Sequence, residues 1–446
     1  MKFFKGNFFH TPTYGKLEYL ENVLIEIDEN GVISKIYNTD NPDYNNKYLF
    51  AKNNNLLYET SKNQYFLPGF IDLHVHAPQW PQAGIALDEP LNIWLDECTF
   101  PLEAKYKDLD FAKTVYTDLV KNLIKRGTTT VLYFATIHKE SSIELAKICK
   151  KLGQRGLIGK VVMDDKTMNP DFYRDESTES AIKDTEDFIL EIKKLNEDCL
   201  QGVYPVVTPR FVPSCTDKAL EELGKLAKKY DTHIQSHCSE GEWEHNFVKE
   251  RFGIRDTQVL EKFGLLTDKS VMAHCNFINE EDGEIFKKHS SSVGHCPISN
   301  VYFANGVIPI KKLKNQGVNI GLGTDISGGF SPSLYENIRQ AVMYSRMLED
   351  GVDVNLPKEK RGVNNSRISI IEAFYLATTG GGEALKLPIG IIKEGYAFDV
   401  QCIDISSLPN FNVFEKPDEI LQRILYLSTT ENINSVFIQG KNVYKK

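Results

Sequence analysis

Residues 70–76 read FIDLHVH, an apolar run that ends in two histidines. A short apolar run that contains branched residues is typical of a buried strand. Because successive side chains of a strand point to opposite faces, His74 and His76 lie on the same face. The sequence therefore predicts a buried strand that ends in two neighbouring imidazoles.

Seven further strand-like runs follow this one, and amphipathic helical segments such as residues 110–127, 179–196 and 216–230 separate many of them. The runs cover residues 128–136, 156–164, 204–211, 233–239, 270–275, 291–297 and 318–325. Residues 366–387 look helical with a glycine stop, so they do not add a ninth strand. Eight strands that alternate with helices predict an α/β fold, a closed parallel (β/α)₈ barrel of the TIM type.

Both ends of the chain look β-rich and lie outside the barrel segment. Val23, Ile25 and Ile27 alternate with polar residues before the turn-like sequence ENG, which predicts a hairpin. Residues 390–405 and 433–446 have a strand-like pattern as well. We therefore predict one small β-sandwich domain built from residues 1–65 and 391–446, with the barrel in residues 66–390.

Composition and charge narrow the class of protein. The formal net charge is -9, and the basic residues are spread among acidic ones, which argues against a nucleic-acid or anionic-membrane partner. No window is long and apolar enough for a transmembrane helix, and the N-terminus lacks the features of a secretory leader. The 8 cysteines include no C-x-x-C pair, which favours free thiols in a reducing compartment. The sequence thus predicts a cytoplasmic protein.

Metal-capable side chains stand at the C-terminal ends of the strand-like runs, the end of a (β/α)₈ barrel where active sites form. They are His74, His76, His237, His274, His295 and Asp325. His74, His76, His237 and Asp325 together offer three nitrogens and one carboxylate oxygen, a set suited to Zn²⁺ or Fe²⁺. The absence of a cysteine ligand fits a catalytic metal site better than a structural one.

Each of these residues alone also has a purely structural interpretation. The histidines can be satisfied core residues, His295 can simply end a strand, and Asp325 can cap a turn or helix. It is their occurrence together at the predicted strand ends that favours a metal site. The remaining histidines are interpreted as surface or core residues: His10, His138, His233, His245 and His289.

A metal with an open coordination position activates water, and the proton of that water needs an acceptor. Glu240 follows His237 by three residues and is the expected general acid/base. Asp325 can serve as ligand and second base, and His274 can hold the attacking hydroxide by a hydrogen bond. These three residues are the predicted catalytic residues.

Several stretches resemble the amidohydrolase superfamily, and within it the enzymes that deaminate guanine. The stretches are PGFIDLHVHAPQ, WLDECTFPLE, GTTTVLYFATIH, GQRGLIGKVVMD, TPRF, HCSE, MAHC, HCPISN and GLGTDISGG. The H-x-H pair and the distal aspartate indicate only the superfamily. WLDECTFPLE, YFATIH, TPRF and HCSE in this order are more specific, and the resemblance covers nearly the whole chain.

The resemblance implies a hydrolytic deaminase of purine catabolism or salvage. It implies one zinc ion per subunit, with Fe²⁺ as the alternative, bound by His74, His76, His237 and Asp325. Metal-activated water attacks C2 of guanine and yields xanthine and ammonia, with Glu240 as the proton shuttle and His274 assisting. No lysine ends the fourth strand-like run, so a bridging modified lysine and a second metal are not supported.

The resemblance also implies a substrate pocket and a homodimer. Gln79 offers an amide to the purine edge, Arg210 offers a fork of donors to O6 and N7, and Phe211 walls the ring. Trp94 is a further candidate for the wall, or it packs in a capping helix. The metal-site residues His76, His237, Glu240 and Asp325 complete the predicted binding set. The H-x-E and P-C-x-x-C pattern of deaminases that act on nucleic acid is absent, which favours the free base as substrate.

Two alternatives remain open at the level of sequence. One is another deaminase or hydrolase of the same superfamily, which acts on a different aminated heterocycle or on an adenosine-like nucleoside. The other is a non-catalytic scaffold that kept the barrel. Gln79 and Arg210 favour an oxopurine, and the complete set of candidate ligands argues against the scaffold.

Overall fold

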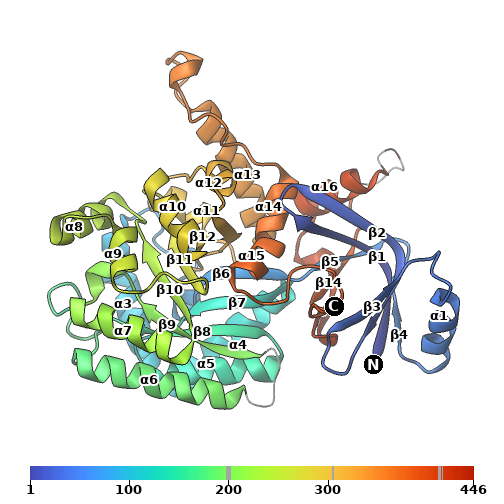
Figure 1. The fold of residues 1–446 in the computed structure, drawn as a ribbon, viewed down its shortest axis with the longest axis horizontal. Coiled ribbons are helices and arrows are strands. Elements are labelled where there is room, and N and C mark those ends of the chain that lie inside the picture. The colour runs from blue at the N-terminus through green and yellow to red at the C-terminus, as the bar shows by residue number, and fades with distance from the viewer. Residues whose placement is uncertain (197–201, 304–305, 410–412, 414) are drawn as a thin grey trace.

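The computed structural model describes residues 1–196, 202–303, 306–409, 413 and 415–446. A barrel of parallel strands and surrounding helices occupies one side of the molecule, and a sheet built from both chain ends occupies the other (Figure 1). The N- and C-terminal ends lie next to each other in this second part. Within the described residues, every helix is too short or too polar to cross a lipid bilayer.

The barrel sheet contains eight parallel strands in sequential order, from β6 at one edge to β13 at the other. They are β6 (Phe70–His76), β7 (Thr128–Phe134), β8 (Arg155–Val162), β9 (Val203–Pro209), β10 (His233–Cys238), β11 (Ser270–His274), β12 (Ser292–His295) and β13 (Asn319–Leu322). Every strand begins within one residue of the start of one of the eight predicted runs and ends at most three residues before the end of that run, so the predicted (β/α)₈ barrel is confirmed.

The helices of the barrel form where the apolar residues recur every three or four positions. In α4 (Leu109–Lys125) the buried positions include Tyr116, Leu119 and Leu123, and the side chain of Asp108 accepts hydrogen bonds from the first turn. The remaining barrel-segment helices are α2 (Leu91–Trp94), α3 (Phe100–Ala104), α5 (Lys139–Leu152), α6 (Thr178–Leu195), α7 (Asp217–Tyr230), α8 (Glu242–Phe252), α9 (Asp256–Lys262), α10 (Glu280–His289), α11 (Pro297–Tyr302), α12 (Ile310–Gln316), α13 (Leu334–Asp350), α14 (Ile370–Ala377) and α15 (Thr379–Ala384). The predicted helix at residues 366–387 is thus confirmed as α14 and α15.

Backbone and side-chain hydrogen bonds link β6 to the residues after β13 and close the barrel. Asp325 N donates to His74 O, and His76 N donates to Ile326 O, both at 2.8 Å. The buried Asp72 carboxylate accepts from Thr324 N at 2.9 Å and from Thr324 Oγ1 at 2.6 Å. This closure brings Asp325 next to the two histidines of β6, although Asp325 is 249 positions after His76 in the sequence.

The terminal segments form one mixed sheet in the order β16-β15-β14-β5-β1-β2-β3, with β4 paired to β1. Its strands are β1 (Lys2–Thr13), β2 (Lys16–Ile27), β3 (Ile33–Tyr37), β4 (Leu57–Glu59), β5 (Gln64–Pro68), β14 (Val400–Asp404), β15 (Ile433–Ile438) and β16 (Lys441–Lys445). Phe4, Phe8, Phe66, Phe398 and Phe437 lie in its core. The prediction that both termini build one separate β-rich part is confirmed, and its described strands form one mixed sheet where we predicted a β-sandwich. The predicted boundaries of this domain stay a prediction.

Two details of this domain differ from the sequence prediction. Residues 390–399 were expected to be strand, but only Val400–Asp404 forms β14, because Gly390 and Gly395 adopt positive φ angles that break the extended path. The N-terminal segment also contains an unpredicted helix, α1 (Tyr44–Asn53), whose Tyr44 and Ala51 pack on Phe3 and Leu24. The polar sequence of α1 shows little helical periodicity, which is why the pattern missed it.

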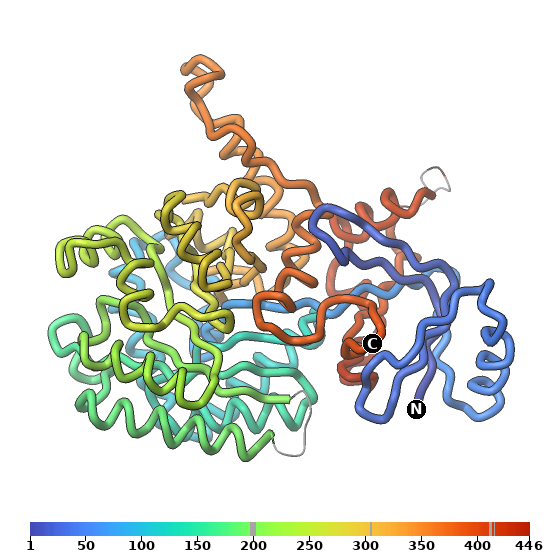
Figure 2. The backbone as a smooth tube through the Cα atoms, in the orientation of Figure 1, coloured from blue at the N-terminus to red at the C-terminus, as the bar shows by residue number. Residues whose placement is uncertain are grey.

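One helix of the C-terminal segment packs on two helices of the barrel segment at the junction of the two parts. This C-terminal helix, α16 (Pro417–Leu427), contacts α13 and α14. The end of α13 and residues 351–367 project away from the barrel as an arm (Figure 2). We call residues 343–367 the projecting arm.

Candidate active site

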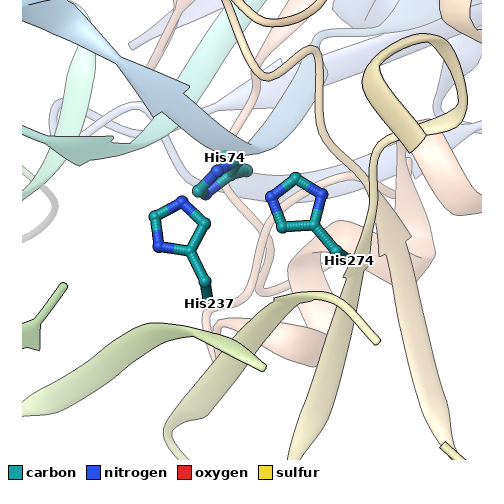
Figure 3. A group of neighbouring side chains, drawn as sticks. All are labelled: His74, His237 and His274. Carbon is teal, nitrogen blue, oxygen red and sulfur yellow. The ribbon is translucent and has the colours of Figure 1, made fainter. Parts of the chain in front are cut away.

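Five metal-capable side chains meet at the C-terminal end of the barrel strands. His74 and His76 end β6, His237 lies in β10, His274 ends β11, and Asp325 follows β13. All five are buried. The rings of His74, His237 and His274 come from three different strands and converge on one point (Figure 3).

The distances define two overlapping groups of possible ligands. One ligand atom from each of His74, His237 and His274 lies within 4.8 Å of the others, and the same holds for His74, His76 and Asp325. Asp325 Oδ1 lies 3.2 Å from His74 Nε2 and 3.6 Å from His76 Nε2. The Nε2 atoms of His76 and His237 are 3.0 Å apart. Such a convergence of nitrogen and carboxylate oxygen atoms is the arrangement that a divalent metal requires.

Hydrogen bonds at the opposite ring nitrogens orient these histidines toward the common point. His237 Nδ1 donates to the carbonyl oxygen of Arg210 at 2.6 Å, and His274 Nδ1 donates to Asn300 Oδ1 at 2.9 Å. The Nε2 lone pairs of both rings therefore face the site, as metal-ligating or substrate-contacting histidines require. His74 Nε2 is buried and makes no hydrogen bond, so a cation at this point would satisfy an otherwise orphaned acceptor.

Several non-glycine residues at these strand ends adopt positive φ angles. The values are 47° at Ser239, 68° at His274 and 50° at Asp325. This conformation is costly for residues other than glycine, asparagine and aspartate, and it clusters at functional sites. Here it turns the chain sharply after each strand, which keeps the ligand side chains pointing into the barrel mouth.

Glu240 lies in the turn between β10 and α8, with Oε1 3.7 Å from His274 Nε2. Its side chain is 15% exposed. Burial and the nearby Asp325 carboxylate together raise the pKa of Glu240 to about 8, against the opposing effect of Arg210. A carboxyl group with this pKa is largely protonated near neutral pH and can donate a proton.

A cavity of about 1010 Å³ opens above the metal-capable side chains. Its wall contains all of the predicted substrate-binding residues, namely His76, Gln79, Trp94, Arg210, Phe211, His237, Glu240 and Asp325. The indole of Trp94 packs on Phe303 at a centroid distance of 5.2 Å and donates to Ile85 O at 3.0 Å. Trp94 thus lies in the cavity wall and also packs within the capping segment. The substrate roles of all these residues stay predictions.

Glu103, which was not predicted from the sequence, joins two of the predicted substrate-binding residues. Its buried carboxylate accepts from Gln79 Nε2 at 3.0 Å and from Arg210 Nη1 at 2.7 Å. The only sequence signal was a lone acid in the apolar stretch FPLE, at the end of one of the family-like motifs.

The remaining histidines stay outside the two ligand groups, as far as the described residues show. His295 ends β12 and is buried, but its Nδ1 has no hydrogen-bond partner and it belongs to neither group. Burial lowers the pKa of His295 to about 3. The histidines interpreted as core or surface residues also belong to neither ligand group: His10, His138, His233, His245 and His289.

Comparison with known proteins places these observations in a family. A model of the amidohydrolase family matches residues 65–443. The guanine deaminase of Dictyostelium discoideum is 38% identical over 460 residues, which cover 99% of this chain and 98% of that protein. The guanine deaminase of Mus musculus is 38% identical over 451 residues, which cover 99% of this chain and 96% of that protein. A crystal structure of guanine deaminase from C. acetobutylicum with bound guanine has a TM-score of 0.89 and 36% identity, and the match covers 99% of this chain and 100% of that chain. The similarity therefore includes both the barrel and the terminal sheet.

Proposed function

The chain belongs to the amidohydrolase family, and we propose that within this family it is a guanine deaminase, which hydrolyses guanine to xanthine and ammonia. The observation that carries the proposal is the convergence of four histidines, Asp325 and Glu240 beneath a cavity that also contains Gln79 and Arg210. Full-length similarity to guanine deaminases supports the same reaction.

The residues of the ligand set fit a single zinc ion at a catalytic site better than they fit a structural metal site. We assign His74, His76, His237 and Asp325 as its ligands, and Fe²⁺ is the alternative ion because it accepts the same donors. A metal held in this way lowers the pKa of a water molecule toward neutrality and supplies a nucleophile at pH 7. The Arg210 carbonyl holds the ring of the ligand His237, and the Asn300 amide holds the ring of His274, which faces the same point but is not one of the four assigned ligands.

Glu240 is placed to move protons during the reaction. Its pKa of about 8 keeps the carboxyl protonated near neutral pH, so it can protonate a ring nitrogen next to C2 of guanine. The resulting carboxylate then accepts a proton from the attacking water and delivers it to the leaving amine. As the C2–N bond breaks and the C2 carbonyl forms, the remaining hydroxyl proton returns to the carboxylate and restores its starting form. His274 Nε2, 3.7 Å from Glu240 Oε1 and 3.9 Å from Asp325 Oδ2, is an acceptor that orients the water. Asp325 can act as second base at the same point.

The upper cavity suits a flat oxopurine. Arg210 and Gln79 can donate to O6 and N7, and Phe211 walls the ring near the metal-site histidines, 6.4 Å from the His237 ring. Trp94 closes the cavity on the side of α2. Since the groups around the ring match a carbonyl and ring nitrogens, guanine is favoured over adenine-like substrates.

A substrate screen on metal-replete protein tests the assignment. We expect ammonia release from guanine, with kcat/KM at least about 100-fold above that for adenine, cytosine or S-adenosylhomocysteine. Adenine and the adenine ring of S-adenosylhomocysteine lack the 6-carbonyl that the site is built to bind, and cytosine lacks the fused purine ring. The measurement is coupled detection of ammonia with each compound at matched concentrations. Faster turnover of any non-guanine compound would favour the alternative deaminase, and protein without metal or activity would favour the scaffold.

We also propose a homodimer in the cytoplasm, on the basis of the family resemblance. The projecting arm carries exposed apolar side chains that a second subunit could cover, among them Met347 at 48% and Val354 at 79% exposure. Light scattering coupled to size-exclusion chromatography should give twice the chain mass for the wild-type protein and the chain mass for a Met347→Lys/Val354→Lys variant. A monomeric wild-type protein would contradict the dimer, and a dimeric variant would place the interface elsewhere.

A further inference from the structure

Glu103 is buried behind the cavity wall and binds two of its residues at once. It lies in α3 and is fully buried, and it is absent from the cavity lining although Gln79 and Arg210 belong to that lining. Its Oε1 accepts from Gln79 Nε2 at 3.0 Å and from Arg210 Nη2 at 3.3 Å, and its Oε2 accepts from Arg210 Nη1 at 2.7 Å. Glu103 therefore reaches the cavity only through these two side chains.

The contact with Glu103 settles which way the Gln79 amide points. A carboxylate can only accept hydrogen bonds, so the NH₂ group of Gln79 must face it. The amide oxygen then lies on the other side, where it accepts from Ser327 N at 3.3 Å. One N–H on Nε2 and one lone pair on Oε1 remain for a ligand.

The same carboxylate fixes the Arg210 guanidinium and compensates its charge. Two N–H groups of the fork are used by Glu103, and the guanidinium stacks over the Phe100 ring at 5.1 Å. Arg210 is the sole lysine or arginine among the described residues that line the cavity, and the other charged lining residues are acidic. With Glu103 paired to it, the described lining offers no uncompensated positive side chain.

We propose that Glu103 is a positioning residue for purine binding: it orients Gln79 and Arg210 and compensates the charge of Arg210, so that the cavity selects a neutral oxopurine over an anionic one. This inference rests on the proposed function, because it names the charge state of the purine that the same site accepts. The proposal also assigns a role in substrate binding to the stretch WLDECTFPLE, since Glu103 is its last residue.

Binding of a neutral and an anionic purine tests the proposal. Hypoxanthine is neutral at pH 7 and lacks the 2-amino group, whereas urate is a monoanion. Calorimetry on zinc-loaded protein should show that the wild type binds hypoxanthine more tightly. In Glu103→Gln the urate-to-hypoxanthine affinity ratio should rise on the order of tenfold, because the Arg210 charge is no longer compensated. In Glu103→Asp, which keeps the charge but not the reach, the ratio should stay within about threefold of wild type.

Catalysis gives a second readout of the same variants. The kcat/KM for guanine should fall roughly 100-fold in Glu103→Gln, since both substrate-binding side chains lose their fixed orientation.

If Glu103→Gln does not fold, the double variant Glu103→Gln/Arg210→Gln replaces it in the purine-binding experiment. Under our proposal this double variant keeps the wild-type affinity ratio, because the net charge of the pair is zero in both proteins. A strong fall in the ratio would mean that Glu103 does not compensate Arg210.

Asp399→Asn is the matched control. Asp399 forms another buried ion pair with an arginine, Arg155, at the start of β8 and thus at the opposite end of the barrel. We expect Asp399→Asn to lower thermal stability and to leave the urate-to-hypoxanthine affinity ratio unchanged.

An unchanged affinity ratio in Glu103→Gln, or an equal shift of the ratio in Asp399→Asn, would overturn the proposal. If the ratio shifts as expected but guanine releases no ammonia, the proposed function fails while the role of Glu103 stands. A wild-type protein that binds neither purine would overturn both.

Discussion

Replacing Glu240 with glutamine should leave the metal content at the wild-type level and lower kcat for guanine by roughly 10³-fold, within the range that general acid–base catalysis contributes. Glutamine keeps the size and polarity of the side chain but cannot donate or accept the transferred proton. The metal should stay because Glu240 is not one of the four assigned ligands and is 3.7 Å from His274 Nε2. The loss should therefore appear in kcat with little change in guanine affinity.

The measurement combines metal analysis of the purified variant with steady-state kinetics of ammonia release. Glu242→Gln is the matched control, since Glu242 is an exposed acid in the lining of the same cavity and belongs to neither ligand group. We expect its kcat to stay close to that of the wild type. Normal turnover by Glu240→Gln would rule out the proton-shuttle role, and loss of metal from it would make Glu240 part of the coordination sphere.

The sequence predicted those site residues whose side-chain type by itself indicates metal binding. Histidines at the ends of short apolar runs and a late aspartate pointed to one end of a barrel, and the structure brings His74, His237 and Asp325 together there. Barrel topology made this prediction possible, because it places all strand ends on one face whatever their separation in sequence. The same rule says nothing about which residue holds which ring, so the Arg210 carbonyl and Asn300 were not foreseen.

Glu103 shows where sequence reasoning stops. Its partners are 24 and 107 positions away, and neither spacing belongs to a helix or strand period. A lone acid in an apolar helix has no distinguishing pattern until the fold places an arginine and a glutamine beside it. The irregular path of residues 390–399 was missed for a similar reason, since the strand-like composition was overridden by two glycines with positive φ.

Asp325→Asn should lower metal affinity by more than about 100-fold, because loss of an outer-shell partner alone typically costs 10–100-fold and this substitution removes a direct ligand charge. Deamination should fall in parallel. Asparagine tolerates the φ of 50° at this position, and the backbone bond from residue 325 to His74 O does not depend on the side chain. The barrel closure should therefore survive, and the effect should be confined to the metal.

Metal analysis, thermal unfolding with and without added zinc, and ammonia release check this expectation. Chelator-treated wild type should lose activity and regain it with zinc, whereas Asp325→Asn should regain activity only at much higher zinc concentrations. Asp282→Asn is the control, because Asp282 is a buried aspartate paired with Arg255 and lies outside both ligand groups. Its metal content should match the wild type even if its unfolding temperature falls. Full zinc occupancy and turnover in Asp325→Asn would remove Asp325 from the ligand set and leave the histidines as the metal-binding group.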